Sequence, residues 1–503
     1  MELGLMLEMA VGEDPARVAV TDVDGTSITR DQLRTMAAAA AARFQSASAT
    51  HAGYLSPNSR MLPVSLFGAA LAGVPFVPFN YRLSDEQLGD VLTRQRGLVV
   101  VTGADGADRL RGLGVDCPVL ASQLLADVSV EPDPVTVDPE DVAVLLYTSG
   151  TTAAPKAAVL RHRHLMSYVI GTVEFGAAGP EEAALVSVPP YHIAGVSAIL
   201  SNLYMGRRIV YLDPFDPTRW LALVREEGVT HAMVVPTMLA RIVDCLGERP
   251  ADVPTLRSLA YGGGRVLQPV IERALACFPD VAFTNAYGLT ETSSTITVLG
   301  PDDHRAALAG DDPGLRRRLT SVGRPLPGVE LAVVGDDGEA LPPGVSGEVS
   351  VRGEQVSGEY VEGSALVAEG WFPTRDRGWL DEDGYLFIEG RSDETIIRGG
   401  ENIAPVEIED VLLRHPAVRE CAVVGVADPE WGQRIAAAVV AAPGHTARPA
   451  ELRDWVRQHL RSSKTPDVVE IRDELPYTET GKLLRRDVTA SLTGGLPDSA
   501  PGR

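Results

Sequence analysis

Lysine is almost absent from this chain of 503 residues, because only three of its 45 basic residues, Lys156, Lys464 and Lys482, are lysines. A lysine ammonium is compact and sits on a flexible stem, which suits contact with a phosphate or carboxylate as a point charge. The three lysines are therefore candidates for specific electrostatic roles. Codon usage is the alternative explanation, and it is weakened because Lys156 and Lys482 each fall within a motif described below.

Cysteine and positive charge are also scarce. The four cysteines lie far apart, with no Cys-x-x-Cys pair. This spacing favours neither a zinc site nor a disulfide framework, and it predicts a protein of the reducing cytoplasm. The formal net charge of −23 argues against general binding to nucleic acid or anionic membranes, since both need a basic surface.

Long apolar runs are missing as well. The longest, residues 63–79, is interrupted by Pro75 and Pro78, so it predicts a buried helix followed by a strand rather than a membrane span. Residues 1–4 do not begin a basic segment followed by an apolar one, and we expect no signal peptide.

The chain is too long for one hydrophobic core, and its β-rich and helical segments alternate. This alternation predicts an α/β protein of layered subdomains with largely parallel sheets. Residues 31–44 and 220–227 predict helices, and residues 96–102, 141–147 and 232–235 predict short buried strands.

The pattern changes towards the C-terminus. Residues 329–351 alternate between short strands and Gly- or Pro-containing turns, which predicts an antiparallel β subdomain. Strand and helix patterns after Asp393 predict a small α+β domain. We therefore predict a large domain over residues 1–392, a small domain over residues 393–490 and a flexible tail over residues 491–503.

The clearest chemical motif follows a predicted strand, at residues 147–156 (Tyr-Thr-Ser-Gly-Thr-Thr-Ala-Ala-Pro-Lys). Its hydroxyl and backbone groups can donate hydrogen bonds to a polyphosphate, and Lys156 can neutralise the phosphate charge. The motif does not match the Walker pattern G-x-x-x-x-G-K-[ST]. An ordinary turn rich in Ser and Thr is the alternative interpretation.

This loop resembles the signature of the adenylate-forming superfamily, which includes acyl-CoA synthetases, adenylation domains of peptide synthetases and firefly-type luciferases. The family loop usually has glycine where Ala153 and Ala157 stand. Alanine at a position that needs a positive φ would strain the backbone. The resemblance implies that Thr152 contributes to a Mg²⁺ site. It also implies that ATP is bound by Thr148, Ser149, Gly150, Thr151, Thr152 and Lys156.

Two further segments resemble family motifs in the family's order. In Tyr-Gly-Gly-Gly at residues 261–264, Gly262 and Gly263 would lie beside the adenine and the acyl group. In Asn-Ala-Tyr-Gly-Leu-Thr-Glu at residues 285–291, Glu291 would hold Mg²⁺, a hard cation that prefers oxygen ligands. Without the resemblance, Glu291 would be interpreted as a surface carboxylate. The ATP-binding residues implied in this second segment are Asn285, Ala286, Tyr287 (stacked on adenine), Gly288 and Thr290 (at the α-phosphate).

Residues 371–376 (Trp-Phe-Pro-Thr-Arg-Asp) resemble the family's Thr-Gly-Asp element, with Arg375 in place of glycine. The resemblance implies that Asp376 accepts hydrogen bonds from both ribose hydroxyls and that Arg391 contacts the ribose and phosphate. Asp393 falls at the family's hinge, about which the small C-terminal domain rotates. An interdomain ion pair is the alternative interpretation of Asp376 and Arg391.

The C-terminal part contains two more elements that resemble the family's. In Thr-Gly-Lys at residues 480–482, Lys482 would bridge the attacking carboxylate and the α-phosphate, offsetting the repulsion between two anions. Gly399 and Gly400 resemble the loop that lines the pantetheine tunnel. Residues 428–432, which include Trp431, also follow the acyl-CoA synthetase pattern. The resemblance therefore implies that Gly399, Gly400 and Trp431 bind CoA.

Tyr191 and His192 resemble the family's aromatic-His-x-x-Gly segment and would border the acyl pocket, together with Gly263 and Gly288. His192 is also a catalytic candidate beside Lys482 and Glu291. Amino-acid adenylating domains commonly place an Asp near this segment to bind the substrate's ammonium. His192 therefore indicates a carboxylic acid without an α-amine.

Together, the resemblance implies an ATP- and Mg²⁺-dependent acid–CoA ligase of the acyl-CoA synthetase type. Three alternatives stay open: transfer to a carrier-protein thiol or an amine, activation of another oxyanion such as nitrite, and a catalytically silent binding protein with the same fold. The identity of the acid and the oligomeric state are also open.

Overall fold

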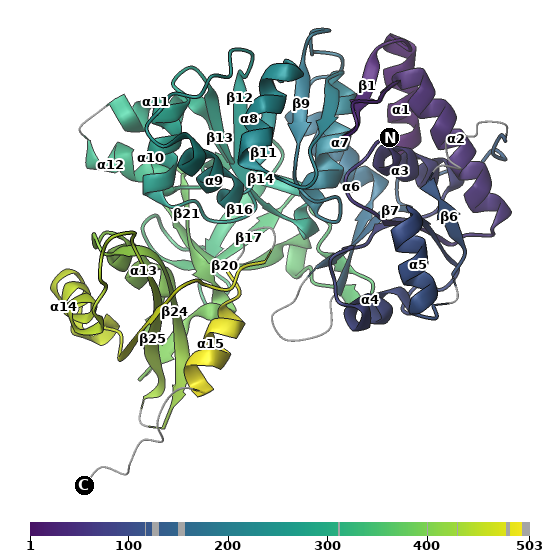
Figure 1. Cartoon of the computed structure of the whole chain (residues 1–503). Helices are drawn as coiled ribbons and strands as arrows, with labels where there is room; N and C mark the ends of the chain where they lie inside the picture. Colours follow the sequence, from purple (N-terminus) through teal and green to yellow (C-terminus); the bar gives the residue numbers. More distant parts are fainter. Residues whose placement is uncertain are drawn as a thin grey trace. The chain divides into compact units, whose positions relative to one another are not determined.

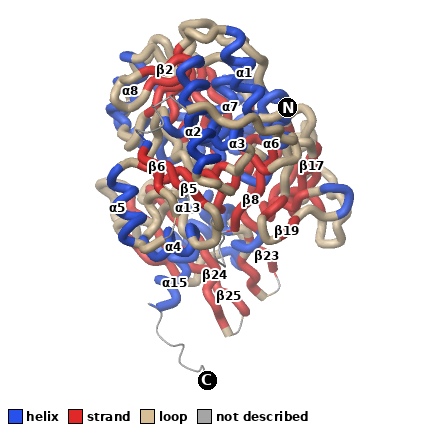
Figure 2. The backbone as a smooth tube through the Cα atoms, turned by 90° about the vertical axis from the view of Figure 1, so that its right-hand side faces the viewer, coloured by secondary structure: helices blue, strands red, loops and turns tan. Residues whose placement is uncertain are grey.

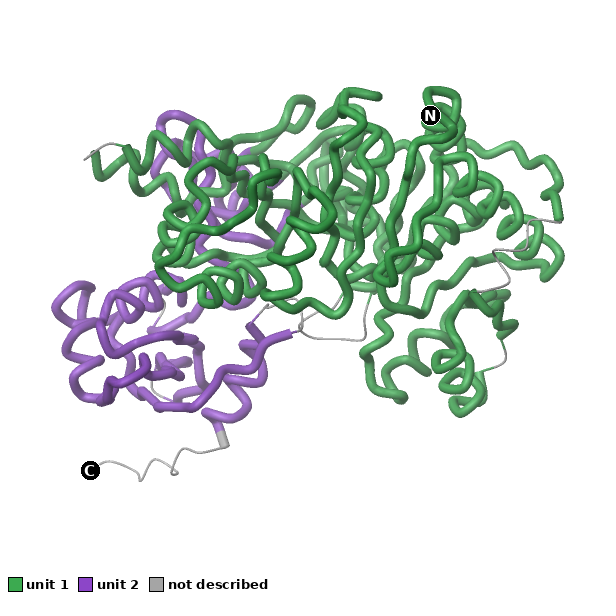
Figure 3. The backbone as a smooth tube through the Cα atoms, turned by 45° about the horizontal axis from the view of Figure 1, so that its top comes forward, with its two compact units in different colours: residues 1–331, 351–372 green, residues 332–350, 373–503 purple. Residues whose placement is uncertain are grey.

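The computed structural model describes residues 1–115, 117–122, 130–148, 156–309, 312–399, 401–429, 431–478 and 483–494. The chain divides into two compact units, one made of residues 1–331 and 351–372 and the other of residues 332–350 and 373–503 (Figure 3). The predicted boundary at Asp393 lies inside the second unit. The hinge stays a prediction, because the compactness of a unit does not identify the residue about which it turns.

The first unit contains a nine-stranded sheet in the order β15-β14-β13-β12-β11-β9-β10-β1-β2 among its described residues. Figure 1 labels β1, β9, β11, β12, β13 and β14 of this sheet. The pairs from β13 through β12, β11, β9 and β10 to β1 are parallel, whereas β2, β14 and β15 pair antiparallel at the two ends. The prediction of a largely parallel sheet is therefore confirmed here. The strands are β1 (Val18–Thr21), β2 (Ser27–Thr29), β9 (Ala183–Val186), β10 (Arg208–Tyr211), β11 (His231–Val234), β12 (Ser258–Gly262), β13 (Ala282–Leu289), β14 (Ser294–Leu299) and β15 (Arg324–Pro325).

A second sheet of this unit has the order β19-β18-β8-β7-β4-β3-β5-β6. Each neighbouring pair from β7 through β4, β3 and β5 to β6 is parallel. The pairs β7–β8, β8–β18 and β18–β19 are antiparallel. The strands are β3 (His51–Leu55), β4 (Phe76–Pro78), β5 (Leu98–Thr102), β6 (Val119–Ala121), β7 (Val142–Thr148), β8 (Lys156–Arg161), β18 (Glu359–Tyr360) and β19 (Gly363–Ser364).

Helices connect these strands and cover the sheets. The described helices of this unit are α1 (Leu3–Glu13), α2 (Arg30–Ser46), α3 (Met61–Ala72), α4 (Asp85–Leu92), α5 (Ala104–Gly112), α6 (His162–Thr172), α7 (Ile193–Met205), α8 (Pro217–Glu226), α9 (Pro236–Leu246), α10 (Gln268–Cys277), α11 (Pro301–Ala309) and α12 (Pro313–Arg317). The predicted helices and strands of this unit are confirmed, with ends that differ by a few residues. Among the described residues, no helix has both the length and the apolar character that a membrane crossing needs.

Helices α2 and α3 lie side by side (Figure 2). Thr29 begins α2 with a capping box, in which its side chain accepts the N–H of Gln32 and the Gln32 side chain accepts the N–H of Thr29. A Cβ added at Gly68 of α3 would lie 2.6 Å from the Cβ of Ala40 in α2. Small residues on both helices therefore let them approach closely in the core of the first unit.

The second unit contains a β-sheet of order β16-β17-β20-β21 and a separate α+β fold. In the α+β fold, β23, β22, β25 and β24 follow one another and β26 pairs with β25. The described elements are β16 (Glu330–Val334), β17 (Gly347–Arg352), β20 (Phe372–Leu380), β21 (Leu386–Arg391), β22 (Ile396–Arg398), β23 (Glu401–Ile403), α13 (Pro405–Leu413), β24 (Val418–Asp428), β25 (Gly432–Ala441), α14 (Pro449–His459), β26 (Val468–Arg472) and α15 (Arg485–Gly494).

Strand β24 has two buried faces. Cys421 and Val423 pack into a core with residues of α13 and α14, whereas Ala422 and Val424 pack into a second core with residues of α15. The alternation follows from the two-residue period of a strand. The small α+β fold predicted after Asp393 is therefore a three-layer arrangement. All four cysteines are free thiols, as their spacing predicts.

Candidate active site

The ends of the predicted phosphate loop are held together by strand pairing. Thr148 ends β7 and Lys156 begins β8, the two residues pair across the antiparallel ladder, and the Thr148 hydroxyl donates to the Lys156 carbonyl at 3.3 Å. Ser149, Gly150, Thr151 and Thr152 lie outside the described residues. Ala157 is buried in β8 and is not among the described residues with positive φ, so alanine is not strained there.

The two glycine-containing motifs lie on neighbouring strands. β12 and β13 pair in parallel, which places Tyr261 opposite Asn285 and Gly262 opposite Ala286. A Cβ at Gly262 would lie 2.1 Å from the Ala286 oxygen, so glycine is required for the approach of the strands. Gly263 has φ +79°, a conformation that favours glycine. The structure therefore brings together two segments that the resemblance assigns to one nucleotide site.

Tyr261 anchors the start of the glycine motif. Its side chain is buried and its hydroxyl lies 2.9 Å from Nε2 of His304. Burial raises the pKa of the Tyr261 phenol and lowers the pKa of the His304 imidazole. Both groups are therefore neutral near pH 7, and neither adds charge beside Gly262.

Residues 287–290 continue from β13 into a short turn. Gly288 lies against β14, where an added Cβ would be 1.8 Å from the Ser294 oxygen. Tyr287 is half-buried, and Thr290 begins the 3₁₀ turn Thr290–Thr292. Because the two backbones are in such close contact, only glycine fits at position 288.

Glu291 is buried, with 8% of its surface exposed, which corrects the interpretation of this residue as a surface carboxylate. Its Oε1 accepts a hydrogen bond from the Tyr360 hydroxyl at 2.5 Å. Within the described residues its Oε2 accepts no hydrogen bond, and no Lys, Arg or His side chain forms an ion pair with it. A buried carboxylate needs a compensating partner, because removing a charge from water is costly.

The surroundings of Glu291 fit a Mg²⁺ ion shared with a bound phosphate. Mg²⁺ prefers oxygen ligands and commonly binds through one or two carboxylates plus substrate phosphates. The described residues contain no cluster of three or more His, Cys, Asp or Glu that could hold a metal without such a ligand. Glu291 would therefore supply the protein carboxylate.

Tyr191 and His192 lie directly before α7. Tyr191 is buried and meets the ring of Tyr81 edge-on at 5.7 Å between centroids, while its own ring lies 4.8 Å from that of His192. His192 is half-buried at the N-cap of α7. Further along the helix, the Ser197 hydroxyl accepts a hydrogen bond from the Ser294 hydroxyl of β14 at 3.3 Å. Helix α7 thus contacts the segment that follows Glu291, a contact between distant parts of the chain for which the sequence carries no signal.

In the second unit, Asp376 and Arg391 are opposite each other on β20 and β21. Arg391 Nη1 donates to Asp376 Oδ1 at 3.2 Å, and Asp376 is 7% exposed. The alternative interpretation as an ion pair is therefore observed, but within one unit rather than between domains. Asp393 lies close by, with 4.0 Å between its Oδ1 and Arg391 Nε.

The predicted CoA residues that the structure describes lie together. The Gly399 N–H donates to the Trp431 carbonyl at 2.8 Å, and Gly399 has φ +56°. The indole of Trp431 is 47% exposed and lies 5.5 Å from the Arg398 guanidinium. Gly400 is outside the described residues.

Of the three lysines, Lys156 lies with its Nζ 5.5 Å from the centroid of the Tyr360 ring. Lys464 forms an ion pair with Glu407 at 2.5 Å, which gives it a structural partner. Lys482 lies outside the described residues. On either side of it, Tyr477 and Leu483 form an isolated antiparallel bridge.

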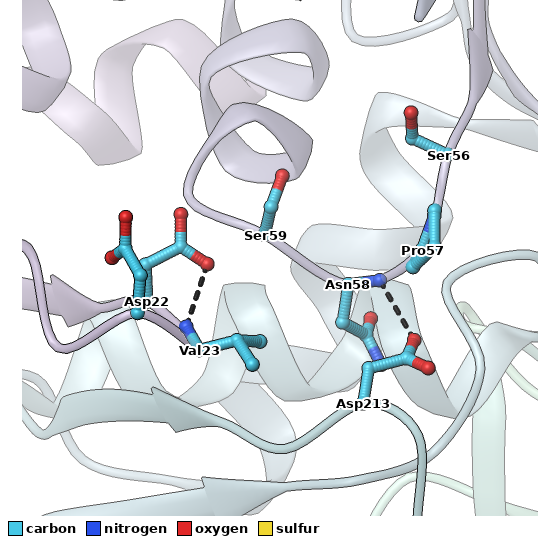
Figure 4. Close-up of a pocket in the computed structure, with 8 residues that line it drawn as sticks. Asp22, Val23, Ser56, Pro57, Asn58, Ser59 and Asp213 are labelled. Carbon is cyan, nitrogen blue, oxygen red and sulfur yellow. Dashed lines mark hydrogen bonds between the residues drawn. The ribbon is translucent and has the colours of Figure 1, made fainter. Parts of the chain in front are cut away.

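None of the predicted site residues lines a cavity of about 430 Å³ in the first unit (Figure 4). Its carboxylates are engaged: Asp22 pairs with Arg60 at 3.0 Å, and Asp213 accepts the Asn58 N–H at 2.9 Å. We assign it no role in the chemistry. Its lining residues are Asp22, Val23, Asp24, Ser56, Pro57, Asn58, Ser59 and Asp213.

Comparisons with known proteins agree with the motifs. A family model described as AMP-binding enzyme matches residues 7–361, and one described as AMP-binding enzyme C-terminal domain matches residues 407–482. The fatty acid–[acyl-carrier-protein] ligase ScoC of Streptomyces coeruleorubidus is 33% identical over 493 residues, which cover 94% of this chain and 93% of that protein. A feruloyl-CoA synthase of an Amycolatopsis species is 34% identical over 475 residues, covering 92% and 94%.

The fold is similar to the crystal structure of ATP-bound MatB from Rhodopseudomonas palustris. The TM-score is 0.87 at 25% sequence identity, and the match covers 98% of this chain and 99% of that one. The matches extend over nearly the whole chain, as do the ordered motifs. The chain therefore belongs to the family of AMP-binding enzymes, within the adenylate-forming superfamily.

Proposed function

We propose that this protein is an AMP-forming acid–CoA ligase. A carboxylic acid attacks the α-phosphate of ATP, which releases pyrophosphate and leaves an acyl-adenylate. The thiolate of CoA then attacks the acyl carbon, and AMP leaves. The observation that carries the proposal is the buried Glu291 carboxylate, because it lacks a cationic partner among the described residues and follows directly on the predicted adenine segment on β13.

The residues of the first unit would bind the nucleotide and the acid. The loop between Thr148 and Lys156 would surround the phosphates, and Tyr287 would stack on the adenine. Glu291 would hold Mg²⁺, which supplies positive charge to the phosphates when bound. Tyr191 and His192 would border the acid.

The residues of the second unit would serve the two half-reactions in turn. Lys482 would bring an ammonium between the acid carboxylate and the α-phosphate, offsetting their repulsion during adenylation. Rotation about Asp393 would then withdraw Lys482 and present Gly399 and Trp431 to CoA. The Asp376 carboxylate would accept hydrogen bonds from the ribose hydroxyls, and Arg391 would hold that carboxylate in place.

The assignment of Lys482 is tested by separating the half-reactions. We expect Lys482→Ala to lower substrate-dependent pyrophosphate exchange at least 100-fold, the scale of removing one stabilising donor from a transition state. Thioester formation from supplied acyl-adenylate should persist. Lys464→Ala is a matched control, since Lys464 is paired with Glu407. Equal loss in both half-reactions would refute the assigned role.

The hinge is tested in the opposite direction. Proline fixes φ and restricts the preceding residue, so Asp393→Pro should hinder rotation at this position. We expect adenylation to continue and thioester formation to fall. If both half-reactions persist in the variant, the hinge lies elsewhere.

The acceptor has a second candidate, a carrier-protein thiol, because the relative ScoC is named an acyl-carrier-protein ligase. Release of AMP should be measured with a panel of acids in the presence of CoA, a phosphopantetheinylated carrier protein or an amine. CoA-dependent AMP release identifies the proposed ligase. Release that only the carrier protein stimulates would identify the second candidate.

A further inference from the structure

One short segment, residues 357–361, holds Glu291 at both its backbone and its side chain. The N–H groups of Ser357 and Gly358 donate to the Glu291 carbonyl at 2.8 and 3.1 Å. The Tyr360 hydroxyl donates to Glu291 Oε1 at 2.5 Å. Three hydrogen bonds from one segment therefore fix the position and the direction of this carboxylate.

The same segment is attached to β8, the strand that begins at Lys156. Tyr360 pairs with Ala158, and the Val361 N–H donates to the Ala157 carbonyl at 3.0 Å. On the other side of the strand, Glu359 forms an ion pair with Arg161 at 2.7 Å. The alternation of β18 thus directs Glu359 towards Arg161 and Tyr360 towards Glu291.

Tyr360 contacts both of the charged groups that the phosphates of ATP would meet. Its hydroxyl bonds to Glu291, and its ring lies 5.5 Å from the Nζ of Lys156. Within the described residues, Lys156 and Glu291 form no ion pair with each other. An ion pair between them would neutralise the carboxylate that the metal needs and the ammonium that the phosphate needs.

We propose that Tyr360 is a positioning residue for the metal site. Its hydroxyl holds Oε1 of Glu291, which would leave Oε2 to hold Mg²⁺, and its position beside Lys156 would keep the two opposite charges apart before ATP binds. This inference rests on the proposed function, because the metal is the one that accompanies ATP.

Tyr360→Phe removes one oxygen atom and keeps the ring beside Lys156. Binding of a fluorescent ATP analogue should be titrated at increasing Mg²⁺ in the absence of any acid, so that no reaction takes place. We expect the Mg²⁺ concentration for half-maximal binding to rise about tenfold, the scale of losing one hydrogen bond to a charged group. In pyrophosphate exchange the same Mg²⁺ requirement should rise, while the KM for the acid is unchanged.

Ser357→Ala is the matched control. The Ser357 hydroxyl donates to the Val159 carbonyl and does not contact the Glu291 side chain, so its removal loosens the same segment without touching the carboxylate. We expect the wild-type Mg²⁺ requirement in this variant. An equal shift in both variants, or no shift in Tyr360→Phe, would overturn the inference. If the wild-type protein itself binds the analogue without any dependence on Mg²⁺, the metal role of Glu291 in the proposed function fails instead.

Discussion

At the scale of single residues, the backbone of Arg375 is the clearest departure from what the side chain prefers. Arg375 is exposed on β20 and has φ +62°, in the left-handed region, at the position where the family motif has glycine. For a residue with a Cβ, this conformation is less favourable than the right-handed one by about 1–2 kcal/mol. Of the positions where the family has glycine, Arg375 thus has a positive φ and Ala157 does not, while Ala153 lies outside the described residues.

We predict that Arg375→Gly raises the free energy of unfolding of the second unit by about 1 kcal/mol, because glycine adopts positive φ without a steric cost. Arg375→Ala keeps the Cβ and should give no such gain. The free energy of unfolding of this unit can be measured from hydrogen exchange of peptides in β20 and β21 at increasing urea concentrations. A lower stability of the glycine variant would show that the Arg375 side chain contributes more than its backbone costs.

Tyr360 could not be predicted from its own sequence context. It lies in a two-residue strand, 69 residues from its partner Glu291, and the segment around it belongs to none of the motifs described above. By contrast, Gly262 and Gly288 were identified as site residues from the resemblance. The structure adds that each lies where two backbones are too close for a Cβ, a cause that the sequence cannot reveal.

At the scale of elements, a buried ion pair fixes α15 in the second unit. Arg485 contacts Glu409 of α13 at 2.5 Å and Glu394 at 3.1 Å, and Glu409 is 5% exposed. Burial alone would lower the pKa of the Arg485 guanidinium, but the two carboxylates outweigh this effect and raise it. Arg485 follows Lys482 by three residues, so this pair fixes the chain just after the predicted catalytic lysine.

We expect Arg485→Ala to lower the free energy of unfolding of the second unit by about 3–5 kcal/mol, because Glu409 would stay buried without its cation. Arg486→Ala removes the neighbouring exposed arginine and should change stability by less than about 0.5 kcal/mol. The free energies of unfolding of the two variants can be compared by urea denaturation. Equal effects would mean that α15 is fixed mainly by its apolar residues.

The helices and strands were largely predictable, because periodicity and capping are local. Helix α2 begins at Arg30 rather than Asp31 and extends to Ser46, since the Thr29 capping box sets its start. The order of strands in the two large sheets was not predictable, because it depends on pairing between distant segments. The pairing of β18 with β8, on which the position of Tyr360 depends, belongs to this second class.

At the scale of the whole molecule, buried neutral histidines couple stability to pH. His162 and His164 are buried, and Nδ1 of each accepts a backbone N–H at 3.2 Å, from Leu3 and Arg161. Burial lowers the pKa of both, and of His231, from 6.5 to about 4. Between these values the unfolded chain binds more protons than the folded protein.

We therefore predict that the histidine contribution to stability is fully present above pH 6.5 and is lost as the pH falls to about 4. The urea midpoint of the first unit should fall between pH 7 and pH 4.5. His162→Asn, which keeps an acceptor for the Leu3 N–H but does not titrate, should make this decline less steep. An unchanged slope in the variant would exclude His162 as a source of the effect.

The division of the chain into interleaved units has a consequence for its synthesis. Residues 332–350 belong to the second unit, yet they leave the ribosome before residues 351–372, which complete the first. Strands β16 and β17 must therefore wait for β20 and β21, their partners in the four-stranded sheet, which end at Arg391. A nascent chain that has exposed β16 and β17 but not yet β20 and β21 would present these strands to chaperones without their partners.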